Sequence, residues 1–170
     1  ELNLTKDQWL LAFQDLNAAH ELYPELADTR EKREFVAAYL QLVKGSNQIL
    51  NQPSLLTSSV KRQHVAEMLK GMTLYSSLSP TMANIENKLD KQLQRYSQEV
   101  VLKVLSDNKT YVEVRSVGKV GVVAEKAISL LPGNYLFQGK RAGYVTKMVK
   151  VVITPEDSGK QVKVIADEQI

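Results

Sequence analysis

The sequence contains no cysteine, only 8 glycines and only 6% aromatic residues. Without cysteine the chain can form no disulfide, no thiolate nucleophile and no thiolate metal site. No apolar run approaches the roughly 20 residues that cross a bilayer, and neither G-x-G-x-x-G nor G-x-x-x-x-G-K-[ST] occurs, so phosphate loops of these kinds are excluded. The apolar fraction of 44% and the charged fraction of 24% are typical of a globular protein.

Groups that could carry out catalysis are scarce. The two histidines, His20 and His64, have no acidic residue and second histidine at metal-ligand spacing. A G-x-S-x-G elbow, which would expose a nucleophilic serine, is missing. The acidic pair Glu156 and Asp157 lies in a loop rich in proline, serine and glycine, where solvated carboxylates are expected. We therefore predict a protein that is not an enzyme and has no cofactor and no metal site.

Charge is distributed unevenly along the chain. The net charge is +3, but residues 1–99 carry 11 bases and 12 acids, whereas residues 100–170 carry 11 bases and 7 acids. The excess of bases in the second part favours an anionic partner for that part, although it is too small to exclude other partners.

The hydrophobic period changes near residue 100, which predicts two regions. Before it, apolar residues recur three and four positions apart; after it, alternation, β-branched residues and six of the glycines follow. We expect an α+β fold with segregated halves: a bundle of about four helices in residues 1–98 and a small antiparallel β-sandwich in residues 99–170. The expected helices cover residues 5–22, 29–50, 58–72 and a segment from 80 to about 96.

Local signals predict where several helices begin and end. Thr5, with a glutamine three residues on, has the pattern of a capping box. Ser79 followed by Pro80 is a cap residue with proline at the first helical position. In the third helix we expect Val60 on the buried stripe and Gly71 as the stop.

The stretch LLPGNYLFQGKRAGY, residues 130–144, is the most unusual in the chain. Pro132-Gly133 predicts a type II turn, because proline presets φ at one central position and glycine accepts positive φ at the next. The strands on either side would then be antiparallel neighbours. Gly143 would permit a second bend, with the ring of Tyr144 closing one end of the sandwich.

The same stretch resembles the PEGA domain family. The signature of that family is a strand, a Pro-Gly turn, an aromatic strand, Gly-Tyr and a final pair of strands. The resemblance covers about residues 99–167, although SVGKVGVV stands where Pro-Glu-Gly-Ala would be expected, as in a divergent subgroup. The matching residues are Leu131, Pro132, Gly133, Tyr135, Gly143 and Tyr144.

The resemblance implies a structural or binding module without known chemistry, found on bacterial envelope and surface proteins. It further implies a periplasmic location and an inner-membrane tether outside these 170 residues. We therefore predict an interaction or scaffolding protein that binds a protein or a cell-envelope polymer.

The candidate binding residues lie at the end of the aromatic strand. If Lys140, Arg141 and Tyr144 gather there, with Lys147 on the next strand, they could meet a carboxylate or phosphate against an aromatic platform. The alternative is an edge strand on which lysines prevent sheet-to-sheet association. Two other functions remain open, a carbohydrate or peptidoglycan binder and a cytoplasmic polyanion binder, although no nucleic-acid partner is expected.

Overall fold

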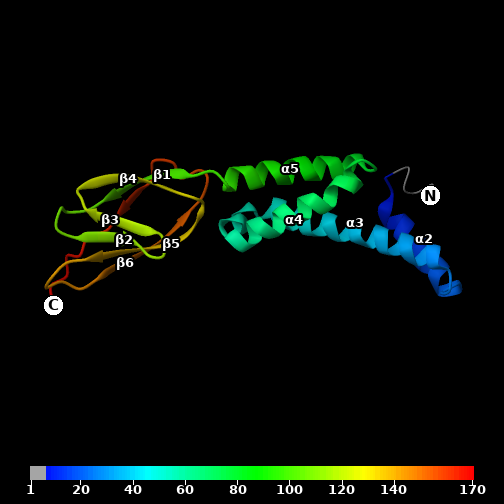
Figure 1. Cartoon of the computed structure of the whole chain (residues 1–170), viewed down its shortest axis with the longest axis horizontal. Helices are drawn as coiled ribbons and strands as arrows, with labels where there is room; N and C mark the ends of the chain where they lie inside the picture. The colour runs from blue at the N-terminus through cyan, green and yellow to red at the C-terminus, as the bar shows by residue number, and fades with distance from the viewer. Residues whose placement is uncertain (1–6) are drawn as a thin grey trace. The chain divides into compact units, whose positions relative to one another are not determined.

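The structure, a computed structural model, describes residues 7–170 and has helices followed by strands (Figure 1). Within these residues four α-helices and one short 3-10 helix, η1, precede two sheets, so the predicted α+β class is confirmed. The helices are α2 (Trp9–Leu22), α3 (Ala27–Asn51), η1 (Pro53–Thr57), α4 (Ser59–Ser76) and α5 (Pro80–Tyr96). The strands are β1 (Val100–Leu105), β2 (Tyr111–Val114), β3 (Gly118–Val122), β4 (Glu125–Leu130), β5 (Gly133–Lys140), β6 (Lys147–Ile153) and β7 (Gln161–Lys163).

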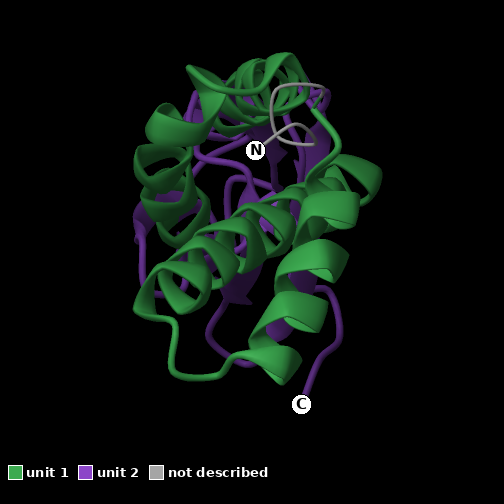
Figure 2. Cartoon of the chain, turned by 90° about the vertical axis from the view of Figure 1, so that its right-hand side faces the viewer, with its two compact units in different colours: residues 1–53, 63–93 green, residues 54–62, 94–170 purple. Residues whose placement is uncertain are grey.

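The chain divides into two compact units, coloured separately in Figure 2. The helical unit comprises Glu1–Pro53 and Gln63–Leu93, and the sandwich unit comprises Ser54–Arg62 and Gln94–Ile170. A short segment from the first half of the sequence therefore belongs with the strands. Arg62 shows one reason: its Nη1 donates to the carbonyl oxygens of Leu56 at 2.7 Å and of Pro132 at 3.0 Å.

Aromatic rings form the centre of the helical unit. Trp9 stacks on Tyr39 with ring centroids 3.9 Å apart and planes 10° apart, and Tyr75 meets both rings edge-on. Phe35 packs 4.7 Å from Tyr75, whose hydroxyl donates to the Phe35 carbonyl oxygen at 3.0 Å. The rings come from α2, α3 and α4, so their burial joins the three helices.

The first turn of α5 has its backbone donors satisfied. Ser79 is the cap residue, as expected, and its Oγ accepts a hydrogen bond from the Met82 N–H at 3.1 Å. Pro80 has no N–H to satisfy, and the N–H of Thr81 donates to Asp7 at 3.3 Å. Asp7 also accepts hydrogen bonds from the hydroxyls of Ser79 and Thr81. A carboxylate more than 70 positions away in sequence thus completes the cap.

Two expectations for α4 are wrong. The helix does not stop at Gly71 but continues to Ser76, because Met72 and Tyr75 are buried beyond the glycine and their packing outweighs its low helix propensity. Val60 is 70% exposed and does not belong to the buried stripe. The expected cap at Thr5 lies outside the described residues.

The sandwich consists of two facing sheets. Sheet A has the strand order β4-β1-β7 and sheet B the order β3-β2-β5-β6. All neighbours are antiparallel except β1 and β7, which are parallel. Alternate residues of each strand face the other sheet, as the sequence pattern predicts. The core contains Val100, Leu102, Val104, Val112, Val114, Val120, Leu130, Phe137, Ile153, Val162 and Val164.

The expected type II turn at Pro132-Gly133 is wrong. β4 belongs to sheet A and β5 to sheet B, so this stretch carries the chain from one sheet to the other and does not join paired neighbours. Gly133 lies in β5 without the positive φ of such a turn; a Cβ there would lie 3.1 Å from the ring of Tyr135. Positive φ occurs at Gly143 instead, at 78°, where the Tyr144 N–H donates to the Arg141 carbonyl oxygen at 3.1 Å. The second expected bend is confirmed.

Candidate binding surfaces of the sandwich

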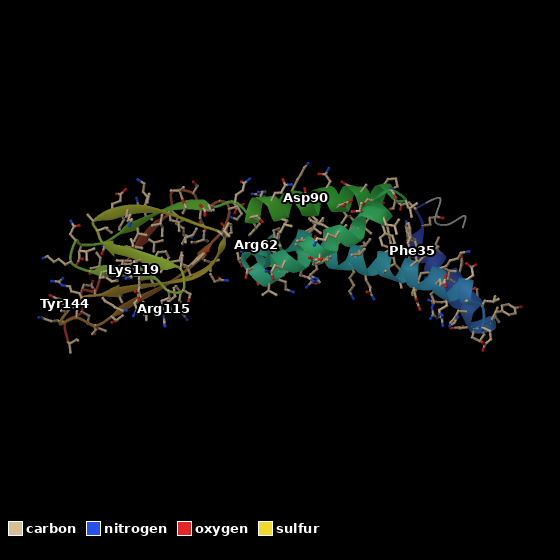
Figure 3. All side chains as sticks on the ribbon, in the orientation of Figure 1. Phe35, Arg62, Asp90, Arg115, Lys119 and Tyr144 are labelled. Atoms are coloured by element: carbon tan, nitrogen blue, oxygen red, sulfur yellow. The ribbon has the colours of Figure 1, made fainter. Side chains whose placement is uncertain are left out.

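Arg141 and Tyr144, two of the four candidate residues, are in contact at one end of the sandwich. The guanidinium carbon of Arg141 lies 3.9 Å from the centroid of the Tyr144 ring, a cation–π arrangement. Nη1 of Arg141 also lies 3.4 Å from Oδ2 of Asp107. The turn at Gly143 brings the two side chains together, and Figure 3 labels Tyr144 at the end of the sandwich unit where the chain terminates.

Asp107 anchors this cluster through its other oxygen. Oδ1 accepts hydrogen bonds from the backbone N–H groups of Thr110, at 2.7 Å, and Lys109, at 3.0 Å. These bonds, that from Thr110 above all, lower the pKa of Asp107 to about 2 despite the opposing effect of desolvation. The carboxylate therefore holds both the β1–β2 turn and the Arg141 guanidinium.

Lys140 and Lys147 leave the sheet from opposite faces. Lys140 lies on the outer face of sheet B, where its Nζ is 2.9 Å from Oε1 of Glu113. Lys147 is opposite Gly139 in the β5–β6 register, on the side of the strand that Phe137 uses to enter the core, and extends into solvent at the end of the sandwich. The four candidate residues therefore do not converge on one site.

A second surface, which the sequence did not single out as a site, is the outer face of sheet B. Its exposed apolar residues include Met148 and Val152, which are 46% and 53% exposed. Around them lie the bases Arg115, Lys119 and Lys150, and within residues 7–170 no ion pair involves any of the three. The sequence contained one signal for this surface. In β2, β5 and β6 every second residue points outward, and combining these outward positions would have identified the face.

Arg115 and Lys119 flank the turn between β2 and β3. Residues 113–119 line a shallow hollow of about 420 Å³, and Figure 3 labels both basic side chains there. Glu113, the acid of this hollow, is already paired with Lys140. The hollow therefore presents two bases that have no acidic partner in the described part of the chain, which suits a carboxylate or phosphate.

The helical unit has an apolar groove of about 440 Å³ between α3 and α4, and one of the two histidines lines it. The other histidine, His20, is on α2, and its Nδ1 is buried with no hydrogen-bond partner among the described residues. In residues 7–170 no three or more histidine or acidic side chains are grouped as metal ligands would be. The groove is lined by Ala38, Gln41, Leu42, Gly45, His64, Met68, Gly71 and Tyr75.

We expect the contribution of Asp107 to stability to disappear in acid. Its folded-state pKa of about 2 lies below the value of about 3.9 for an unfolded aspartate, so the contribution is present above about pH 4 and is lost as the pH falls towards 2. Asp107→Asn should therefore be less stable than the parent at neutral pH, and this difference in stability should disappear in acid. Thermal unfolding measured across this range tests it.

The matched control for this experiment is Asp167→Asn. Asp167 is exposed, and no hydrogen bond to its carboxylate occurs within residues 7–170, so its removal should not produce a gap that closes in acid. If the stability of Asp107→Asn differed from that of the parent by the same amount at every pH, the lowered pKa of Asp107 would be contradicted.

No protein-family model matches the chain, and no curated protein matches it. Within residues 7–170, none of the helices combines the length and the apolar character needed to pass through a bilayer.

Proposed function

We propose that the protein is a non-enzymatic interaction protein of the bacterial cell envelope, which binds an anionic partner through the outer face of sheet B. The observation that carries the proposal is the unbalanced charge of this face. Arg115, Lys119 and Lys150 have no acidic partner among residues 7–170 and lie around exposed apolar side chains. A flat surface with an apolar centre and basic margins suits recognition of a carboxylate-bearing protein or polymer.

The periplasmic location and the tether belong to the same proposal. They are supported by the likeness of Leu131, Pro132, Gly133, Tyr135, Gly143 and Tyr144 to the PEGA pattern. The helical unit would then serve as a spacer or as a docking element for protein.

Reversing two charges on the outer face of sheet B tests the proposal. Arg115→Glu with Lys119→Glu should weaken capture of components from a bacterial envelope extract by about tenfold or more, because like charges then oppose the anionic partner. The control is Lys109→Glu with Lys163→Glu, which changes the net charge equally on other parts of the sandwich. Equal loss in both variants, or no loss in either, would contradict a site on this face.

A carbohydrate or peptidoglycan site at the Arg141–Tyr144 end is the second candidate. The ring of Tyr144 with a guanidinium on one face resembles the platforms on which sugars stack, and this geometry favours it. Tyr144→Ala with Arg141→Ala should then abolish sedimentation with purified peptidoglycan while the melting temperature stays nearly constant. If Tyr144→Ala alone unfolds the sandwich, the ring has a structural role and the second candidate fails.

A further inference from the structure

β6 is an edge strand of sheet B with an open outer side. The sheet order ends at β6, and no strand of residues 7–170 pairs with its other side (Figure 1). The chain covers the C-terminal end of this side with polar groups. Lys160 Nζ donates to the Val152 carbonyl oxygen at 3.2 Å, and the Thr154 N–H donates to Oδ2 of Asp157 at 2.8 Å.

These two bonds indicate which backbone groups of β6 point outward. In a strand the N–H and C=O of one residue point to the same side, and the side alternates along the chain. Val152 and Thr154 therefore have the same orientation as Met148 and Lys150. The outward groups of Met148 and Lys150 have no partner among the described residues, so the open stretch covers about five residues, from Lys147 to Val151, or roughly 17 Å.

The charge of this edge disfavours a second copy of the same strand and favours an acidic one. Lys147 and Lys150 form no ion pair within residues 7–170. Two β6 strands paired antiparallel would bring these lysines close to one another, which is unfavourable. A strand carrying glutamate or aspartate would neutralise them.

An acidic extended segment of the chain pairs with the residues that precede β6. The Val145 N–H donates to the Glu168 carbonyl oxygen at 2.7 Å, and the Ile170 N–H donates to the Gly143 carbonyl oxygen at 3.1 Å. Tyr144 and Gln169 form an antiparallel bridge between these bonds. The paired segment follows Asp167 and contains Glu168, so the sandwich already includes one short bridge with an acidic segment.

The other three edges lack this combination of features. β7 has only three residues, and β3 pairs with β2 through a shifted register. On β4, Glu125 is paired with Lys103 at 3.2 Å, and Lys126 donates to the Val120 carbonyl oxygen at 2.9 Å.

We propose that β6 binds an extended acidic segment of a partner protein by strand addition, with Met148 and Lys150 supplying the backbone hydrogen bonds and Lys147 and Lys150 the charge. The proposal rests on the proposed binding role of the sandwich and names the partner class. Lys150 lies on the same face of β6 as Met148 and Val152, and Lys147 lies on the other face, so the partner would carry acidic side chains on both faces and apolar side chains near Met148 and Val152. There, Asn134, Leu136 and Lys150 help to line a hollow of about 270 Å³.

The direct test is amide hydrogen exchange of the full chain with a synthetic heptapeptide of sequence Val-Val-Glu-Glu-Val-Val-Glu, which presents glutamate on both faces of an extended strand. On binding, exchange of the Met148 and Lys150 amides should slow by about tenfold or more, because strand addition gives each a hydrogen-bond acceptor. A heptapeptide with lysine in place of glutamate should produce no slowing. Failure of the acidic peptide to bind at millimolar concentration, or binding that leaves both amides unprotected, would overturn the proposal.

Substitutions at Met148 distinguish the contribution of its backbone N–H to peptide binding from the contribution of its side chain. Met148→Pro removes one outward N–H, keeps both lysines and should weaken peptide binding by about tenfold or more, whereas Met148→Ala should cost less than about threefold. Because proline could disturb the strand, Lys147→Glu with Lys150→Glu provides a second variant, which should weaken binding at least as much while leaving the backbone intact.

The outcomes distinguish this inference from the proposed function. If envelope components are still captured by the Met148→Pro variant and the acidic peptide does not bind, strand addition is wrong and the outer face of sheet B remains the site. If the Arg115→Glu with Lys119→Glu variant captures as well as the parent, the proposed function fails instead. A dimer that Met148→Pro dissociates would identify a second copy as the occupant and would also overturn the inference.

Discussion

Phe137→Ala is expected to lower the free energy of unfolding of the sandwich by about 3–5 kcal/mol. Phe137 is fully buried in β5 and lies opposite Val114 of β2 and Val149 of β6. Its removal leaves a cavity between two sheets whose backbones are held by ladders on both sides, so the surrounding side chains can fill little of the space. Amide hydrogen exchange of the β5 and β6 residues in increasing urea would measure the loss for this unit by itself.

Leu136→Ala is the matched control, because it removes an aliphatic group from the opposite face of the same strand. Leu136 is only partly buried and lies opposite Lys150, so we expect a loss of about 1 kcal/mol. Equal losses at the two positions would mean that β5 does not place Phe137 in the core and Leu136 on the outer face, and the surface assigned to binding would then be misplaced.

Trp9→Ala is expected to cost the helical unit a similar amount, about 3–5 kcal/mol. Trp9 is 3% exposed, stacks on Tyr39 and packs near Phe35 and Tyr75. Its removal therefore leaves a cavity where α2, α3 and α4 meet. Its Nε1 also donates to Oδ1 of Asp7 at 2.8 Å. Urea unfolding followed by circular dichroism is suitable, since the substitution removes the one tryptophan of the chain.

Two further variants divide the effect of Trp9 into packing and hydrogen bonding. Leu10→Ala changes a neighbouring residue that is 59% exposed and should cost no more than about 0.5 kcal/mol. Trp9→Phe keeps a ring but removes the donor to Asp7, and should cost about 1–2 kcal/mol. If Trp9→Ala cost no more than Leu10→Ala, the aromatic cluster would not be the core of this unit.

The hydrogen bonds at Asp7 also have a consequence in acid. Burial acts to raise the pKa of Asp7, but the hydrogen bonds from Ser79, Thr81 and Trp9 outweigh it and lower the pKa below its ordinary value. The contribution of this carboxylate to the stability of the helical unit is therefore present near neutral pH and is lost as acid protonates the folded-state group.

Local patterns predicted most of the secondary structure correctly. The stripe of Met82, Ile85, Leu89 and Tyr96 is buried on α5, because one face of a helix repeats every three to four residues whatever packs against it. Strand alternation placed Val112 and Val114 in the core and their neighbours outside for the same reason. These periods are properties of the backbone and need no knowledge of the partner elements.

The errors fell where distant parts of the chain decide the outcome. Gly71 was expected to stop a helix, but Met72 and Tyr75 have buried positions beyond it. Pro132-Gly133 was expected to form a tight turn, but the strands on either side of it pair in different sheets. Neither outcome is a property of the nearby residues, because burial and strand pairing depend on segments far away in sequence.

The candidate site shows the same division. Arg141 and Tyr144 are three residues apart, and the positive φ of Gly143, which the sequence indicated, was enough to bring them into contact. Whether Lys140 joins them depended on Glu113, a residue of another strand that pairs with it. Proximity across strands is set by register, and register was not apparent from any one segment.

By itself, the sequence determined the order of helices and strands, the buried face of most of them and the absence of thiol chemistry, because these follow from side-chain type and from backbone periods. Only the tertiary structure decided which strands became edges, which lysines had acidic partners and which carboxylate capped α5. The physical reason is that hydrogen-bond partners and ion pairs are chosen by distance in space, and chain segments tens of residues apart become neighbours only when the core has formed.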